Sequence, residues 1–163
     1  MARIAVISDS HAWSLKGLSP DLVKVLPETD WVVHCGDYTG LAVVRELKAL
    51  SKRFVGVYGN VDPRDIRDEL PAKAVFEVEG KRIGVIHPSW GGPPFRIEED
   101  IARELDGVDI ILFGHTHDIC HKTVGNVIFV NPGQAYSDFY APASCSILTI
   151  AQDGVKVEIK TFD

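Results

Sequence analysis

Five short segments of this 163-residue sequence carry side chains that bind metal ions in proteins. Four imidazoles, two carboxylates and one amide suit borderline ions such as Mn, Fe, Ni, Co or Zn better than an all-oxygen Mg or Ca site. Seven ligands exceed what one ion holds, so the set predicts two divalent ions that share a carboxylate. The ligand set does not choose among these metals, and we expect Mn first. The seven residues are Asp9, His11, Asp37, Asn60, His87, His115 and His117.

A centre of this composition would attract an anion. Two dications carry four positive charges and two aspartates offset two of them, which leaves about +2. The chain as a whole has a net charge of -6 and no run of five like charges. This balance argues against a surface that grips nucleic acid non-specifically. We therefore expect a small phosphate-ester substrate to bind at the metal centre itself.

Each of the five segments follows a short apolar run with the pattern of a buried strand. Ligands of open α/β sheets collect at the carboxyl ends of strands, so successive strand ends would bring the seven side chains together. Two pairs, Asp9 with His11 and His115 with His117, are separated by one residue, and such side chains point the same way on an extended chain. The runs are residues 4–7, 31–33, 54–57, 82–86 and 110–113.

Glycines precede three of these side chains, at Gly36, Gly59 and Gly114. A glycine permits a sharp turn and a close approach of the backbone to its neighbours. We therefore expect crowded loops around the ligands.

The remaining patterns predict helices between the strands and a strand-rich C-terminal part. Apolar stripes at helical spacing over residues 41–50 and 97–105 predict two amphipathic helices. Asp62 before Pro63 has the pattern of a helix cap, for a short helix ending near Leu70. No linker or repeat divides the chain, so we expect residues 1–163 to form a single layered α/β domain, with sheets face to face and helices outside. Turn residues that predict hairpins lie at 79–81, 125–126 and 152–154.

Cysteine usage and hydropathy indicate a cytoplasmic protein. Cys35, Cys120 and Cys145 are odd in number and lack CxxC spacing, which fits a reducing compartment. The N-terminal apolar run is shorter than a secretory signal requires. No segment approaches the ~20 apolar residues that cross a bilayer, so we expect no membrane association. The strand-rich C-terminal segment offers an edge through which a homodimer could form.

Read in order, the motifs SDSH, GD, GN, a single His87 and GHTH resemble those of the calcineurin-like metallophosphoesterases. The short length, GNVD at residues 59–62 and NPG at residues 131–133 resemble the small YfcE-type phosphodiesterase subgroup. The resemblance covers nearly the whole chain. It implies a four-layer α/β/β/α fold and a two-metal hydrolase.

The resemblance also implies how the seven side chains divide between the ions. A hydroxide bridging the ions would attack phosphorus, while the ions clamp the phosphoryl oxygens. Asp37 would bridge both ions, and we assign it to catalysis together with Asn60 and His87. The first metal would be held by Asp9, His11 and His117. The second would be held by Asn60, His87 and His115.

Two departures from the family pattern bear on the reaction. Val61 stands where many members have a histidine thought to protonate the leaving group, and the Asp-Arg pair often found after GD is missing at Tyr38-Thr39. Without a general acid, leaving groups of low pKa are favoured, so we expect a phosphodiesterase. One alternative is a phosphomonoesterase or nucleotide phosphatase. The other is a non-catalytic protein-interaction scaffold like the retromer subunit of this fold.

Four residues near the motifs have competing interpretations. For Asp62, helix capping is favoured over a role in orienting water or substrate. Tyr38 and Trp90 lie beside ligands, where packing and stacking on a substrate ring both fit. His34 lies inside a strand, and we expect it to be structural.

Overall fold

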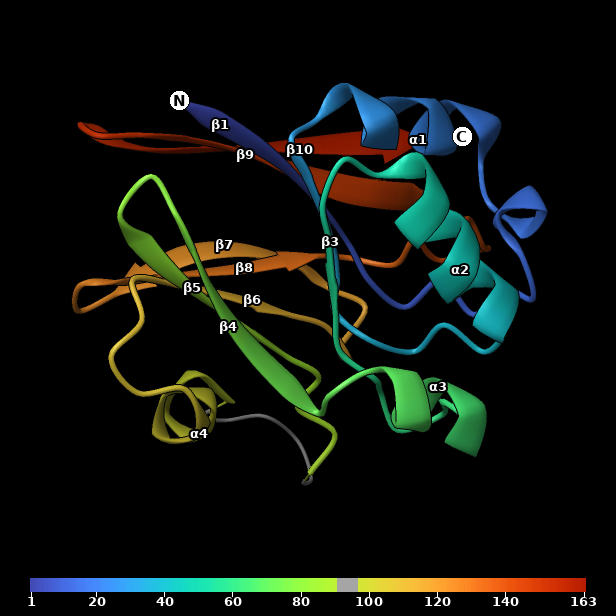
Figure 1. The fold of residues 1–163 in the computed structure, drawn as a ribbon, viewed down its shortest axis with the longest axis horizontal. Helices are drawn as coiled ribbons and strands as arrows, with labels where there is room; N and C mark the ends of the chain where they lie inside the picture. The colour runs from blue at the N-terminus through green and yellow to red at the C-terminus, as the bar shows by residue number, and fades with distance from the viewer. Residues whose placement is uncertain (91–96) are drawn as a thin grey trace.

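Ten strands form two five-stranded sheets in the part of the chain that the computed structural model describes, residues 1–90 and 97–163 (Figure 1). The first sheet has the order β10-β9-β1-β2-β3 and the second has the order β4-β5-β6-β8-β7. The strands of the first sheet are β1 (Ala2–Ile7), β2 (Trp31–His34), β3 (Phe54–Gly56), β9 (Ala143–Ala151) and β10 (Gly154–Phe162). The strands of the second are β4 (Lys73–Val78), β5 (Lys81–Ile86), β6 (Ile110–Phe113), β7 (Ile119–Val124) and β8 (Val127–Pro132). The α-helices are α1 (Pro20–Val25), α2 (Leu41–Leu50), α3 (Arg64–Glu69) and α4 (Ile97–Glu104), and short 3-10 turns lie at Leu15–Gly17 and Leu26–Glu28.

Three groups of buried apolar side chains among the described residues separate four layers. Ile7 of β1 packs with Leu47 of α2, between the first sheet and its helices. The preceding residue of β1, Val6, faces the second sheet, because successive side chains of a strand point to opposite faces. Ile101 of α4 packs with Phe113 of β6 on the far side of the second sheet. Figure 1 shows α1 and α2 outside one sheet and α4 outside the other, which confirms the α/β/β/α order.

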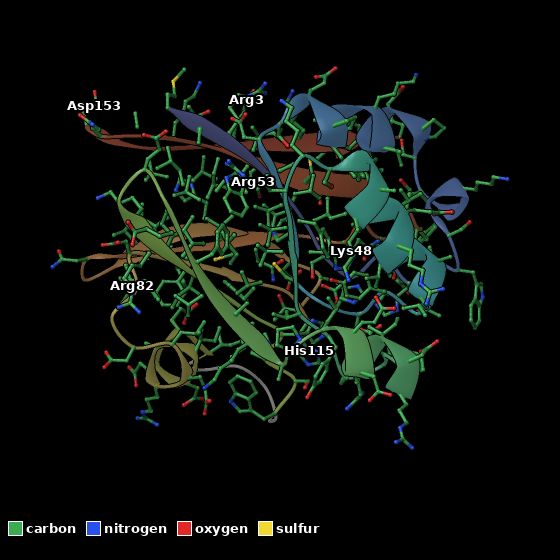
Figure 2. The ribbon with its side chains drawn as sticks, viewed as in Figure 1. Arg3, Lys48, Arg53, Arg82, His115 and Asp153 are labelled. Atoms are coloured by element: carbon green, nitrogen blue, oxygen red, sulfur yellow. The ribbon has the colours of Figure 1, made fainter. Side chains whose placement is uncertain are left out.

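The parallel strands of both sheets position the predicted ligands. β1, β2 and β3 are parallel neighbours in the first sheet, and β5, β6 and β8 are parallel neighbours in the second. Parallel strands end at the same edge of a sheet, and the segments that follow β1, β2, β3, β5 and β6 are those that carry the seven side chains. A contact between His115 after β6 and Asn60 after β3 joins the two edges. His115 marks this edge beside α3 in Figure 2.

The predicted helices and hairpins are present, with shifted ends. The turn at Glu79-Gly80 has two left-handed residues (φ 51° and 75°), as a tight hairpin between twisted strands requires. The C-terminal hairpin pairs nine residues on each side and extends beyond the predicted runs. Its extra residues include the buried Ser144, whose polarity hides the strand pattern in the sequence. Within the described ranges, no helix is long and apolar enough to cross a membrane.

Truncation of Ile101 tests the outer layer formed by α4. Ile101 is 0% exposed, so Ile101→Ala should lower the free energy of unfolding by about 2–5 kcal/mol because it leaves a cavity. The matched control Ile119→Ala removes the same atoms from a side chain that is 48% exposed, and should cost less than about 1 kcal/mol. Urea denaturation followed by circular dichroism measures both values. Equal losses would contradict the packing described for α4.

Candidate metal centre

Six of the seven predicted side chains fall into two groups whose ligand atoms lie within 4.8 Å of one another. Asn60 joins the second group, because its Oδ1 lies 3.0 Å from Nε2 of His87 and 3.2 Å from Nδ1 of His115. The structure therefore brings all seven side chains together, and metal binding by them stays a prediction. The first group is Asp9, His11 and His117. The second group is Asp37, His87 and His115.

Asp37 lies between the two groups. Its Oδ2 is 3.3 Å from Nε2 of His87 and 3.8 Å from Nε2 of His11. Its Oδ1 accepts a hydrogen bond from the N–H of Val61 at 3.0 Å. One carboxylate oxygen thus faces an imidazole of each group, which is the position that a bridging ligand needs.

Asp9 is fully buried, and its two carboxylate oxygens have different surroundings. Oδ2 accepts hydrogen bonds from Ser8 Oγ at 2.6 Å and from the N–H of His115 at 3.1 Å. Oδ1 has no hydrogen-bond partner among the described residues, but it lies 3.3 Å from Nε2 of His117 and 3.9 Å from Nε2 of His11. A buried oxygen without a hydrogen bond is costly, and a cation held by the same residues would satisfy it. The first group therefore fits a divalent ion.

Hydrogen bonds from the Nδ1 atom orient the imidazole rings of two of the histidines. Nδ1 of His87 donates to the carbonyl oxygen of Cys35 at 2.8 Å, and Nδ1 of His117 donates to Oε1 of Gln134 at 3.0 Å. The amide nitrogen of Gln134 in turn donates to the carbonyl oxygen of Tyr136. These acceptors require the proton on Nδ1, so each Nε2 is free to face the carboxylates. Such support is usual behind metal-binding histidines.

Charge interactions within the groups shift the pKa values in opposite directions. Burial alone would raise the pKa of both aspartates, but the contact with His117 and other neighbours lowers the pKa of Asp9, and His87 lowers the pKa of Asp37. The close approach of Asp9 raises the pKa of His117 to about 9. Burial opposes a raised pKa at His87, yet Asp37 and Asp9 hold that pKa above its ordinary value. The aspartates are therefore ionised and attract cations.

Both predicted ligand pairs lie on residues with a left-handed backbone conformation. The prediction that Asp9 with His11, and His115 with His117, point the same way because they lie on an extended chain was therefore wrong. β1 and β6 end before the ligands begin. The loop after β1 is held to the loop after β2 by bonds from the N–H groups of Asp9 and His11 to the carbonyls of Gly36 and Asp37. Positive φ values outside glycine are rare, and they concentrate at functional sites, where surrounding contacts hold the strain. They occur at Asp9 (50°), His11 (42°), Asp37 (62°), His115 (80°) and His117 (61°).

Close backbone approach at the glycines agrees with the expectation from the sequence. A Cβ atom at Gly59 would collide with Oδ1 of Asp37, and a Cβ atom at Gly114 would collide with Oγ of Ser8. Both neighbours are rigid parts of the site. A side chain at either position would displace an aspartate or the serine that orients one.

The carboxylate of Asp62 joins two ligand loops. It is buried, at 3% exposure, and its two oxygens accept four backbone N–H groups from the loops after β2 and β3. These loops carry Asp37 and Asn60, so one side chain sets the separation between a bridging ligand and its neighbour. The four N–H groups belong to Tyr38 (2.7 Å), Gly59 (2.7 Å), Asp37 (2.9 Å) and Thr39 (3.0 Å).

Asp62 therefore does not cap a helix, and that prediction was wrong. α3 begins at Arg64, and the preceding Pro63 is extended, with ψ 172°. Among the described residues no side chain caps the helix, and the Asp62 carboxylate bonds instead to the loops after β2 and β3. The acid directly after the GNV sequence was the signal for its role, but the adjacent proline favoured the capping interpretation.

Tyr38 and His34 have structural roles. Tyr38 is fully buried and stacks on the His34 ring at a centroid distance of 3.7 Å. His34 contacts Ser10 Oγ through Nε2, and burial lowers its pKa to about 3, which keeps the ring neutral. Trp90 differs from both, because it is 47% exposed and lines a pocket beside His87.

Sequence reasoning did not identify Gln134 and Tyr136. Gln134 orients His117, and the Tyr136 ring meets the rings of His11 and His117 edge-on, at centroid distances of 5.8 and 6.1 Å. Both residues follow the NPG sequence at 131–133, which was the available signal. Their contacts depend on how the loop after β8 folds back over the site.

Removal of the Asp62 carboxylate tests its role between the loops. Asp62→Ala should lower the free energy of unfolding of the metal-free protein by about 3 kcal/mol or more, because three buried N–H groups and one partly buried N–H group lose their acceptor. Asp65→Ala is the matched control, since that carboxylate accepts a bond from its neighbour Ile66 and should change stability by less than about 0.5 kcal/mol. Urea denaturation in the presence of EDTA measures both. A similar loss of unfolding free energy in the two variants would show that the Asp62 carboxylate does not hold the two loops together.

Comparison with known proteins agrees with this geometry. The calcineurin-like phosphoesterase superfamily domain matches residues 2–153. A probable metallophosphoesterase of Methanocaldococcus jannaschii is 33% identical over 132 residues, which cover 80% of this chain and 66% of that protein. A phosphodiesterase of the same organism is 26% identical over 148 residues, covering 81% of this chain and 83% of that protein.

Solved structures share the fold. A Thermotoga maritima protein determined by NMR in solution has a TM-score of 0.77 and 35% identity, covering 99% of this chain and 100% of its own. A Vps29 protein of Entamoeba histolytica in complex with zinc has a TM-score of 0.76 and 26% identity, covering 99% of both chains. Since the family domain spans all seven residues of the two groups, the resemblance read from the motifs is confirmed. This chain belongs to the calcineurin-like phosphoesterase superfamily.

Proposed function

We propose that this protein is a metal-dependent phosphodiesterase that hydrolyses small phosphate esters with two divalent ions. The observation that carries the proposal is the place of Asp37, whose Oδ2 faces His11 in one group and His87 in the other. An oxygen in this place can bridge two ions, and two-metal phosphoesterases use such a pair to clamp an in-line displacement. The related Methanocaldococcus jannaschii protein named as a phosphodiesterase supports the substrate class.

We assign one ion to each group. Asp9, His11 and His117 would hold the first ion. Oδ1 of Asp9, which has no hydrogen-bond partner among the described residues, supports this assignment. His87, His115 and the amide oxygen of Asn60 would hold the second, with Asp37 shared. A donor set rich in imidazole favours Mn, Fe, Co, Ni or Zn, and Mn remains our first choice. The Entamoeba histolytica Vps29 solved with zinc supports a borderline ion in this fold.

Residues of the chain would position the two ions and their ligands for the reaction. When bound, two divalent ions would supply positive charge to the phosphoryl oxygens and activate a water molecule for attack. Asp37 would fix the spacing of the ions, while Asn60 and His87 would orient the second one beside the substrate. Ser8 and the His115 backbone hold Asp9 so that only one of its oxygens faces the first group.

The position of Val61 supports a preference for diesters. Val61 is 47% exposed beside the Asp37 loop and has no proton to give to a leaving group. A leaving group of low pKa needs no such proton, and phosphodiesters with an aryl arm have one. The monoesterase alternative would require another proton donor. Likeness to Vps29 structures leaves the scaffold alternative open without favouring it. The cytoplasmic location and the homodimer stay predictions.

Activity on a matched pair of substrates tests the proposal. With Mn(II) added, the protein should hydrolyse bis(p-nitrophenyl) phosphate faster than p-nitrophenyl phosphate. Both compounds release p-nitrophenolate, so the two rates compare a diester with a monoester at a constant leaving group. Release of p-nitrophenol measures both rates. If neither compound reacts in protein loaded with two equivalents of metal, the enzyme proposal fails, and a faster monoester rate would refute the preference for diesters.

Removal of the bridging carboxylate tests the role of Asp37. Asp37→Ala should lower the rate on the diester by a factor of about 10³ or more, because both ions lose a ligand. Asp21→Ala is the control, since that exposed carboxylate pairs with Lys24 on α1, belongs to neither ligand group and should keep the full rate. Bound metal is measured in parallel by atomic absorption. Retention of more than a few per cent of the rate by Asp37→Ala would show that Asp37 is not the bridge.

Metal addition and pH should change stability together. Mn(II) at a hundred times its dissociation constant should add about 2.7 kcal/mol to the free energy of unfolding. The gain should grow from about pH 6 to pH 9, since protons compete with metal for the imidazoles, and the pKa of His117 is raised to about 9. In the metal-free protein the same raised pKa stabilises the fold below about pH 6.5, and this contribution is lost as the pH rises through about 9. Thermal unfolding with Mn(II) or with EDTA measures the difference, and a gain independent of pH would contradict ligation by these histidines.

A further inference from the structure

A pocket of about 320 Å³ opens beside the second ligand group. Asn60 and His87 line it, so a phosphate bound at the proposed centre would lie beside it. Tyr58, Arg67 and Trp90 form part of the remaining wall. A phosphodiester has two arms attached to phosphorus, and the pocket is large enough to take one of them.

The positive charge of this pocket comes from Arg67. Lys73 also lines the wall, but it pairs with Glu104, whose carboxylate lies 3.3 Å from its Nζ. Arg67 forms no ion pair with a carboxylate in the described ranges, and its hydrogen bonds go to backbone carbonyls. Its charge is therefore not offset by an acidic side chain, and it can pair with an anion.

The surroundings of Arg67 hold its guanidinium in place. The group lies over the ring of Tyr58, at 4.9 Å from the centroid. Nε donates to the carbonyl of Asp62 at 2.7 Å, and Nη2 donates to the carbonyl of Asn60 at 3.0 Å. Arginine has five N–H donors in a rigid plane, so donors remain for a ligand after these bonds are made. A guanidinium fixed in this way loses little freedom when it binds an anion.

Trp90 offers an apolar surface on the same wall. It is 47% exposed, and it lines the pocket beside His87. Exposed indole rings stack readily on flat groups such as nucleobases. The pocket thus combines an unpaired cation with an exposed ring.

We propose that this pocket binds one arm of the substrate and selects an arm that carries a second anionic group and a flat ring. Arg67 binds the anionic group, and Trp90 packs against the ring. A diester with a phosphorylated nucleoside as one arm has this chemistry. The inference rests on the proposed phosphodiesterase function and names the class of substrate that the same site prefers.

Two esters that differ in a single phosphate test the proposal. Both are p-nitrophenyl esters of thymidine 5′-phosphate, and one of them also carries a 3′-phosphate. The leaving group and the ring are the same, so the ratio of their kcat/KM values reports the second anion alone. The wild-type protein should prefer the 3′-phosphorylated ester by about tenfold, as expected for one charge-assisted contact.

Variants of two arginines on the same helix separate the pocket from general effects. Arg67→Met should reduce the ratio to about one, and Arg67→Lys should keep part of the preference because it keeps the charge. Arg64→Met is the matched control, since the side chain of Arg64 is 93% exposed and pairs with Asp68, and it should keep the full ratio. Each ratio is taken within one variant, so a general loss of activity cancels.

Different outcomes would overturn the assignment of the pocket and the proposed phosphodiesterase function. A ratio near one in the wild type, or an unchanged ratio in Arg67→Met, overturns the assignment of the pocket. If Arg67→Met does not fold, the wild-type ratio and the Arg67→Lys ratio decide the question alone. Failure of the metal-loaded protein to hydrolyse bis(p-nitrophenyl) phosphate overturns the phosphodiesterase proposal instead.

Discussion

Two buried aspartates, Asp9 and Asp37, place ionised carboxylates at the edge where the two sheets meet, and much of the surrounding structure compensates for that burial. Ionised carboxylates are costly in a protein interior unless hydrogen bonds or opposite charges surround them. Here backbone N–H groups, a serine hydroxyl and imidazoles supply that compensation. One oxygen of each aspartate is satisfied by hydrogen bonds, and the other faces histidines. The arrangement that keeps the carboxylates charged also directs them at a cation.

The conformation of the loops around Asp9 and Asp37 brings backbone groups and ligand side chains close to the two carboxylates. Glycines at positions 59 and 114 allow the backbone to approach the carboxylates, and left-handed residues turn the ligands inward. Asp62 then joins two of the loops through four backbone N–H groups. Backbone strain of this kind persists only where the surrounding contacts hold it. The two packed sheets supply a rigid frame against which these loops are held.

In the function proposed above, the metal ligands and the substrate pocket adjoin, because Asn60 and His87 also line the pocket. Hydrogen bonds join several of the loops that carry the proposed ligands to one another, which suits a centre of fixed geometry. Arg67 and Trp90 lie outside that shell, and neither is among the proposed metal ligands. Arg67 nevertheless contacts the ligand loop, because its guanidinium donates to the backbone carbonyl of Asn60.

The sequence by itself determined the places of all seven proposed ligands, because each follows an apolar strand and the carboxyl ends of parallel strands meet at one edge. Strand and helix patterns also predicted the layered α/β fold, since burial on one or both faces leaves a readable period. Only the tertiary structure decided the role of Asp62, which acts on residues up to 25 positions away, and the support of His117 by Gln134. It also decided the left-handed turns at the ligands and the pocket around Arg67. These features depend on contacts between loops that are distant in the sequence. A local sequence pattern does not predict which distant backbone groups a side chain will contact.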